Sequence, residues 1–168
     1  MDATDARRKM DSIMTATVAV FDPFRPLLNR TGEWVGLLGI RLLLAFEYGN
    51  AGIAKWNGEN WFGGLQSDFP FPFNVLPAEF SWFLATWSEL LGAVALVVGL
   101  ATRFFSLSLF ILTVVAWVSV HAGNGYNVCD DGYMLPLVFM IMLVPLMLSG
   151  PGKLSLDYLW LKRSGRST

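Results

Sequence analysis

Sulfur and imidazole ligands are almost absent from this chain of 168 residues, which contains one cysteine and one histidine. With Cys129 alone, the chain forms neither an intramolecular disulfide nor a self-contained dithiol relay. With His121 alone, it cannot ligate a haem through two histidines. The sequence also contains no phosphate-cradling loop, no nucleophile elbow and no zinc helix motif. We therefore expect no cofactor held by the chain itself, and no soluble-type hydrolase or nucleotide enzyme.

Charged residues are also scarce: 15% of the chain is charged and 54% is hydrophobic. A mean hydropathy of +0.50 is too high for an ordinary soluble domain of this size. Four apolar stretches fill most of the chain, and each approaches the roughly 20 residues that a helix needs to cross a bilayer. They are residues 33–54, 80–100, 104–122 and 133–149. The sequence therefore predicts an all-α membrane protein built as an antiparallel bundle of four transmembrane helices.

The basic residues lie mostly on one side of these predicted spans. Ten of them flank the spans on the side of the termini: Arg7, Arg8, Lys9, Arg25, Arg30, Arg103, Lys153, Lys162, Arg163 and Arg166. The two other loops hold Lys55 against five carboxylates: Glu59, Asp68, Glu79, Asp130 and Asp131. By the positive-inside rule both termini are cytoplasmic and the acidic loops face outward. A net charge of −1 indicates no nucleic-acid partner.

We divide the chain into three parts. Residues 1–32 are a cytoplasmic and interfacial segment, residues 33–152 form the transmembrane domain, and residues 153–168 are a cytoplasmic interfacial tail. The tail is expected to hold a short helix that Ser155 caps, with Asp157 near its positive N-terminal end.

The longest connection, residues 56–79, is rich in aromatic residues and proline. It contains Phe69, Phe71 and Phe73 together with three prolines, so it is expected to fold back as an interfacial lid. An aromatic belt without further function is the alternative.

Three ionisable residues lie within the apolar stretches, where an ionised side chain costs a few kcal/mol or more. At 1.5 Å per residue, Arg41 lies about 12 Å and Glu89 about 16 Å from the cytoplasmic ends of their spans. We therefore expect an Arg41–Glu89 ion pair that fixes how the first two helices dock. Lys55 shares a helix face with Arg41.

Glu47 is then the surplus carboxyl of the first span. Together with Tyr48, it could relay protons or bind a quinone head group from a membrane cavity. The structural alternative is one more satisfied polar contact. His121, Cys129, Asp130 and Asp131 lie close in sequence and are weak candidates for a metal site, but their spacing matches no ligand motif, which favours a solvated loop.

Three motifs in the chain resemble the DoxX family of small four-helix membrane proteins. They are RLLLAFEYGNAGIAKW (residues 41–56), ELLGAVALVVGLATR (89–103) and GPGKLSLD (150–157). The matching positions are Arg41, Gly52, Lys55, Glu89, Gly99, Arg103, Gly150, Pro151, Gly152 and Asp157. The resemblance implies a four-helix bundle in the bacterial inner membrane. The family takes its name from a subunit of a thiosulfate:quinone oxidoreductase, and other members are linked to redox or thiol-stress complexes.

Three functions follow as hypotheses. The first is a membrane subunit of a quinone-linked or thiol/sulfur redox complex, in which a partner protein supplies the redox centre. The second is a scaffold or assembly factor that docks a partner through the aromatic loop. The third is transport of protons or a small solute by a homo-oligomer. The sequence does not decide whether the chain is an enzyme.

Overall fold

The computed structural model describes residues 7–13, 15 and 22–165, and this part of the chain is helical without strands. Four helices form the body of the protein: α3 (Leu37–Asn57), α4 (Ala78–Val98), α5 (Thr102–Ala116) and α6 (Met134–Ser149). A π-helical turn, Gly32–Gly36, leads into α3, and another, Trp117–His121, extends α5. A short helix, α7 (Leu156–Arg163), follows α6.

Three helical segments are long and apolar enough to cross a membrane: Trp34–Asn57, Ala78–Val98 and Thr102–Asn124. They confirm the positions of the first three predicted spans to within a few residues. The fourth helix, α6, is apolar but has 16 residues, which reach about 24 Å. The membrane class is therefore supported, whereas the count of four spans and the cytoplasmic position of both termini stay predictions.

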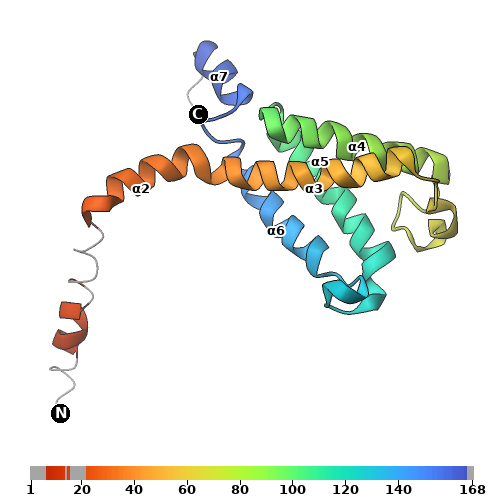
Figure 1. Cartoon of the computed structure of the whole chain (residues 1–168), viewed down its shortest axis with the longest axis horizontal. Coiled ribbons are helices and arrows are strands. Elements are labelled where there is room, and N and C mark those ends of the chain that lie inside the picture. The colour runs from red at the N-terminus through yellow and green to blue at the C-terminus, as the bar shows by residue number, and fades with distance from the viewer. Residues whose placement is uncertain (1–6, 14, 16–21, 166–168) are drawn as a thin grey trace.

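The four helices form two antiparallel hairpins that are joined at one end and splayed at the other (Figure 1). In the first hairpin α3 packs along α4, in the second α5 packs along α6, and α4 also contacts α5. The tight turn between α4 and α5 lies at the joined end, as the sequence predicts. The hydrophobic core lies toward this end and consists of Leu44, Ala45, Tyr48, Leu96, Leu109, Leu143 and Leu146.

Small residues allow α3 and α4 to pack closely. A Cβ atom on Gly52 would lie 2.9 Å from the Leu90 side chain, and one on Gly49 would lie 3.6 Å from the Ala93 Cβ. Close backbone approach of this kind is how membrane helices gain van der Waals contact, because lipid offers no hydrophobic driving force between them.

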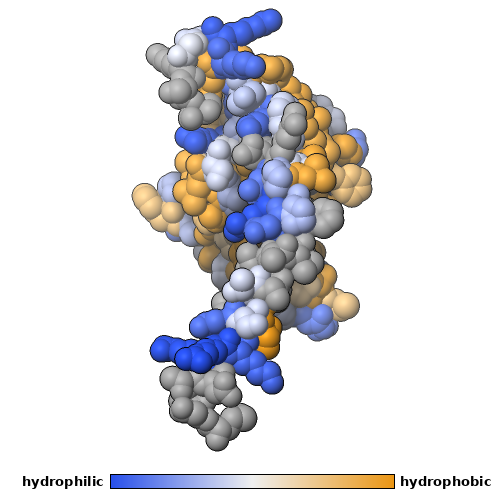
Figure 2. Space-filling view, turned by 90° about the vertical axis from the view of Figure 1, so that its left-hand side faces the viewer, coloured by the Kyte–Doolittle hydropathy of each residue, from blue (hydrophilic) through white to orange (hydrophobic). Residues whose placement is uncertain are grey.

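The outer surface of the bundle suits a lipid environment. Phe46, Val94 and Leu148 are among many large apolar side chains that point away from the core. Seen from the end that carries α7, hydrophilic residues occupy the middle of the surface and hydrophobic residues its flanks (Figure 2). This distribution is expected of a bundle whose sides face hydrocarbon and whose ends face water.

The N-terminal region is an arm that leads away from the bundle (Figure 1). It contains a 3-10 turn, Asp22–Phe24, and the helix α2 (Arg25–Thr31), which continues through the π-helical turn into α3. Residues 1–6, 14 and 16–21 of the predicted N-terminal segment and residues 166–168 of the predicted tail lie outside the described residues.

The single cysteine provides a direct test of orientation. Cys129 is exposed in the loop between α5 and α6, so a membrane-impermeant maleimide should label it in sealed right-side-out vesicles without lysis. The acidic character of this loop is the physical reason. The control is the double variant Cys129→Ser/Ser164→Cys, which moves the thiol to the end of α7 and should be labelled only after lysis. Labelling with the opposite pattern would place both termini outside.

Candidate functional site

The predicted Arg41–Glu89 ion pair is wrong, because Arg41 binds backbone carbonyls instead. The Arg41 side chain is fully buried, with 0% of its surface exposed. Its Nε donates to the Leu96 oxygen at 2.7 Å and its Nη2 to the Val97 oxygen at 2.8 Å. Its Nη1 donates to the oxygens of Pro151 at 3.0 Å and Leu154 at 2.7 Å. A guanidinium has five N–H donors and no acceptor, so four of the five are used here.

The unpaired carbonyls in the last turn of α4 explain why the Arg41 side chain binds there. The final four carbonyls of a helix have no partner within it, and the negative end of the helix dipole attracts a cation. The Leu96 and Val97 oxygens are two of these carbonyls. The positions of Arg41 and Glu89 along their helices indicate only which side chains can meet. They carry no information on acceptors that belong to the backbone.

Asp157 holds the same region from the other side. Its carboxylate accepts hydrogen bonds from the backbone N–H groups of Ala101 at 2.8 Å and Thr102 at 2.9 Å, so it caps the start of α5. Its own N–H donates to the Gly99 oxygen at 3.0 Å. Ser155 caps α7 as predicted, because its Oγ accepts from the Tyr158 N–H.

We call this assembly the clasp: Arg41, the α4–α5 turn at residues 99–102, and residues 150–157. It joins the first, second and third motifs at one end of the bundle. Arg103 lies beside it and donates to the Leu148 oxygen at 3.2 Å, which satisfies a carbonyl at the end of α6. Gly99 at the start of the turn and Arg103 just after it, two positions of the second motif, therefore have a structural role.

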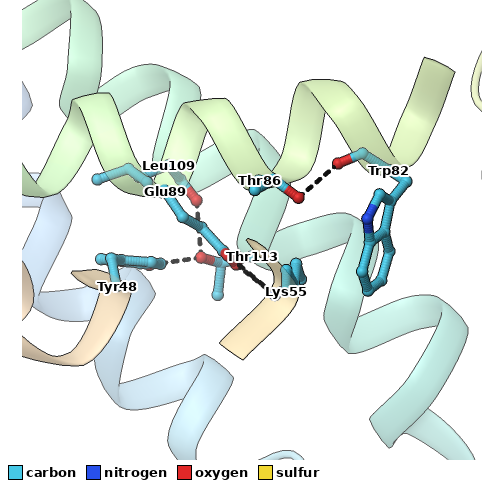
Figure 3. Close-up of polar contacts among 7 residues, drawn as sticks. All are labelled: Tyr48, Lys55, Trp82, Thr86, Glu89, Leu109 and Thr113. Carbon is cyan, nitrogen blue, oxygen red and sulfur yellow. Dashed lines mark hydrogen bonds and ion pairs between the residues drawn. The ribbon is translucent and has the colours of Figure 1, made fainter. Parts of the chain in front are cut away.

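Glu89 pairs with Lys55 rather than with Arg41. The Lys55 Nζ lies 2.8 Å from one carboxylate oxygen of Glu89 and 2.9 Å from the other, between α3 and α4 (Figure 3). Glu89 is 4% exposed, and this bidentate contact neutralises its charge within the bundle. Lys55 lies at the end of α3, and its long side chain extends to reach the carboxylate.

Tyr48 belongs to a second buried chain of hydrogen bonds (Figure 3). Its hydroxyl lies 2.6 Å from Thr113 Oγ1, and Thr113 Oγ1 donates to the Leu109 oxygen at 2.7 Å. Because the single hydroxyl hydrogen of Thr113 goes to Leu109, Tyr48 must be the donor to Thr113. The phenol oxygen therefore keeps acceptor capacity but has no hydrogen left to give.

A cavity of about 640 Å³ opens between the helices and is also lined by the α3–α4 loop and the α5–α6 loop. Its wall contains residues of all four long helices, and Tyr48, Lys55 and Glu89 contribute polar groups. Five aromatic rings also line it: Trp61, Phe62, Phe69, Phe73 and Phe139. A space of this size, mostly apolar with a few polar groups, is typical of a small-molecule site.

The loop at residues 58–77 folds back over this cavity, as its aromatic and proline content predicts. Phe62 packs edge-on against Trp82 of α4 with ring centroids 5.0 Å apart, and against Phe69 at 5.1 Å. Phe69 is buried, Phe73 lines the cavity, and Phe71 is 81% exposed. The three phenylalanines therefore have different environments.

Glu47 and Ser81 are among the polar groups of the cavity wall that have no partner among the described residues. Glu47 is half-buried, lines the cavity and makes no hydrogen bond or ion pair there. Ser81 is 5% exposed, and its hydroxyl also has no hydrogen-bond partner. A buried polar group without a partner costs free energy, so both groups are available to a ligand. Ser81 was missed from the sequence, although its place eight residues before Glu89 puts both on one face of α4.

The weak metal candidates do not form a ligand set. Within the described ranges, no group of three or more His, Cys, Asp and Glu side chains lies close enough to hold a metal ion. The His121 Nδ1 lies 2.6 Å from the backbone oxygen of Asp131, so this nitrogen must carry a proton. Asp130 accepts from the Asn127 amide at 2.9 Å. These contacts describe an ordered loop rather than a metal site, and only His121 and Asp131 of the four candidates line the cavity.

Replacement of Gly99 tests how tightly the clasp is packed. Gly99 has φ +71°, and an added Cβ would lie 2.5 Å from both Arg41 Nη2 and Ser155 Cβ. Gly165 has a similar φ of +68° but open space around it. Both alanine variants share a positive-φ strain of about 1 kcal/mol. Gly99→Ala should lose on the order of 2 kcal/mol more than Gly165→Ala from overpacking. Thermal unfolding in detergent measures the difference, and equal losses would contradict the packing argument.

Replacement of Arg41 by lysine tests the carbonyl contacts. Arg41→Lys keeps the charge but removes the planar fork, so several buried carbonyls lose their donor. We expect the free energy of unfolding to fall by on the order of 3 kcal/mol. The matched control is Arg103→Lys, which affects one exposed contact and should cost less than about 1 kcal/mol. Equal effects in the same unfolding assay would show that Arg41 acts through charge alone.

Comparison with known proteins supports the resemblance that the motifs indicate. The family model of DoxX matches residues 36–122, which is just over half of the chain. An uncharacterized protein of Haemophilus influenzae is 52% identical over 128 residues, covering 76% of this chain and 85% of that protein. No solved structure gives a significant match. The chain belongs to the DoxX family of membrane proteins.

Proposed function

We propose that the protein is a membrane subunit of a quinone-linked redox complex and that its cavity holds the quinone head group. The observation that supports this function is the apolar cavity of about 640 Å³ with unpartnered polar groups, Glu47 and Ser81, in its wall. In this proposal the complex lies in a bacterial inner membrane with both termini of the chain cytoplasmic.

The wall of the cavity suits a flat, lipid-soluble ring. Trp61, Phe62, Phe69, Phe73 and Phe139 provide apolar surface against which a quinone ring and the start of its tail can be buried. The helices around the cavity are those that lie against lipid, so a lipid-soluble ligand has a short way to enter.

Polar groups at separate depths of the wall can each bond an oxygen of a quinone or a hydroxyl of a quinol. Gly49 and Gly52 of α3 face Ala93 and Leu90 of α4, which places Glu47 about 20 Å along the bundle from Ser81. The Ser81 hydroxyl and the N–H of Lys55 that Glu89 does not use can donate to a quinone carbonyl. The Glu47 carboxylate can accept a hydrogen bond from the hydroxyl of a quinol. Tyr48 cannot donate a hydrogen bond to the quinone, because its hydroxyl already donates to Thr113.

The redox step needs a partner. A quinone takes up two electrons and two protons to become a quinol. In our proposal a redox centre on a partner protein exchanges the two electrons, and the two protons pass one after the other between the quinone oxygens and water, with Glu47 as a relay. The chain thus binds and positions the quinone while another protein carries the electrons.

A scaffold function is the second candidate, and one observation favours it. Phe71 is 81% exposed at the surface of the folded-back loop, with Val75 also exposed nearby in sequence. Exposed apolar side chains on an ordered loop can dock a partner protein. Because Phe69 and Phe73 face inward, the single variant Phe71→Ser separates docking from damage to the cavity.

Ser81→Ala tests the quinone site. A short-chain benzoquinone titrated into the purified protein in detergent should give saturable quenching of tryptophan fluorescence, since Trp61 lines the cavity. Loss of one hydrogen bond of about 1 kcal/mol should weaken the affinity about fivefold in Ser81→Ala.

The matched control for this experiment is Ser106→Ala. Ser106 is also buried with an unpartnered hydroxyl, but it does not line the cavity, so its replacement should leave the affinity unchanged. Absence of saturable binding, or equal weakening in both variants, would contradict a quinone site at this position.

A further inference from the structure

We infer that the cavity also binds lipophilic organic cations, and that Glu47 is the residue that selects for their charge. This inference goes beyond a neutral quinone, and it holds or fails independently of the redox function. It rests on the balance of charge in the cavity wall, on the missing partner of Glu47 and on the aromatic rings.

The cavity wall has an excess of negative charge. Three carboxylates line it, Glu47, Glu89 and Asp131, against one lysine, Lys55. Lys55 and Glu89 neutralise one another through the bidentate contact (Figure 3). Neither Glu47 nor Asp131 forms an ion pair within the part of the chain that the structure describes. A recess with uncompensated charge of one sign and low-dielectric walls concentrates ligands of the opposite sign.

Glu47 is the carboxylate placed to meet the cation. It lies within α3, ten residues before the end of that helix, and faces an apolar cavity without a partner among the described residues. A carboxylate in such surroundings is stabilised only when a counter-charge or a hydrogen-bond donor reaches it. Arg41 and Lys55, the two basic residues of the same helix, are both bound elsewhere. A cationic ligand would supply the counter-charge that no described residue gives to Glu47.

The aromatic rings define the rest of the ligand. Tyr48, next to Glu47 in the chain, and Phe139, whose ring centroid lies 5.7 Å from that of Tyr48, line the cavity. The faces of aromatic rings attract cations that have lost their water. The same rings and the aliphatic wall bury apolar substituents at about 25 cal/mol per Å². A small hydrated ion gains nothing from this wall. The preferred class is therefore an organic cation whose charge is shielded by aryl or alkyl groups.

Tetraphenylphosphonium is a suitable probe for this class. We would titrate it into the full chain, purified in an uncharged detergent, by isothermal titration calorimetry. We expect saturable binding, a loss of affinity of about tenfold or more in Glu47→Gln, and near-normal affinity in Glu47→Asp. The matched control is Glu79→Gln, which removes the same charge from an exposed position outside the cavity and should bind normally.

A neutral compound of similar shape, triphenylphosphine oxide, separates charge from apolar contact. It should bind weakly and equally to the wild-type protein and to Glu47→Gln. Equal affinity of the two compounds, or equal loss in Glu47→Gln and Glu79→Gln, would overturn the inference. If Glu47→Gln fails to fold, Glu47→Leu takes its place in the same titration with the same expected loss of affinity. Equal affinity of the two compounds for the wild-type protein overturns the inference whichever variant is used.

Ser81→Ala distinguishes the two ligand classes. The phosphonium cation accepts no hydrogen bond, so its affinity should not depend on the Ser81 hydroxyl. Loss of quinone binding with retained phosphonium binding in this variant therefore supports both assignments. Phosphonium binding without any quinone binding would leave the cation site standing and end the redox proposal.

Discussion

The contact between one buried guanidinium and four backbone carbonyls is the constraint on which the rest of this structure depends. Arg41 reaches from α3 to the last turn of α4 and to the segment after α6. Backbone carbonyls that water cannot reach must be satisfied inside the protein, and a membrane bundle has few other donors for them. The rigid fork of arginine satisfies carbonyls of two segments at once. The joined end of the two hairpins is therefore fixed by one side chain, with Asp157 completing it at the start of α5.

Firm attachment at one end leaves the other end of the hairpins free to separate (Figure 1). Residues of all four long helices line the cavity. The remaining polar groups divide into two kinds. Lys55, Glu89, Tyr48 and Thr113 satisfy one another and so contribute to the packing of the helices. Glu47 and Ser81 have no such partner among the described residues. Of the buried hydroxyls without a partner among the described residues, Ser81 is the one that lines the cavity, so it and Glu47, and not the buried ion pair, point to a ligand.

The two ligand classes that we propose use different features of one cavity. A neutral quinone depends on hydrogen-bond donors, whereas an organic cation depends on the unpaired carboxylate, and both use the same aromatic wall. A membrane protein that binds either class from the lipid phase needs no aqueous path to the site, and this agrees with walls formed by helices whose outer faces are apolar.

The sequence by itself determined the membrane class, the apolar helices, the tight turn before α5, the cap at Ser155 and the folded-back aromatic loop. Hydropathy, helix length and local capping report these features because each depends on residues that are close along the chain. It could not predict the partners of Arg41, since backbone carbonyls are the same for every residue and carry no signal of their position. It also paired Glu89 with the wrong cation and overlooked Ser81. Only the tertiary structure decided which charges are satisfied and which face the cavity, because that depends on how the hairpins join at one end and diverge at the other.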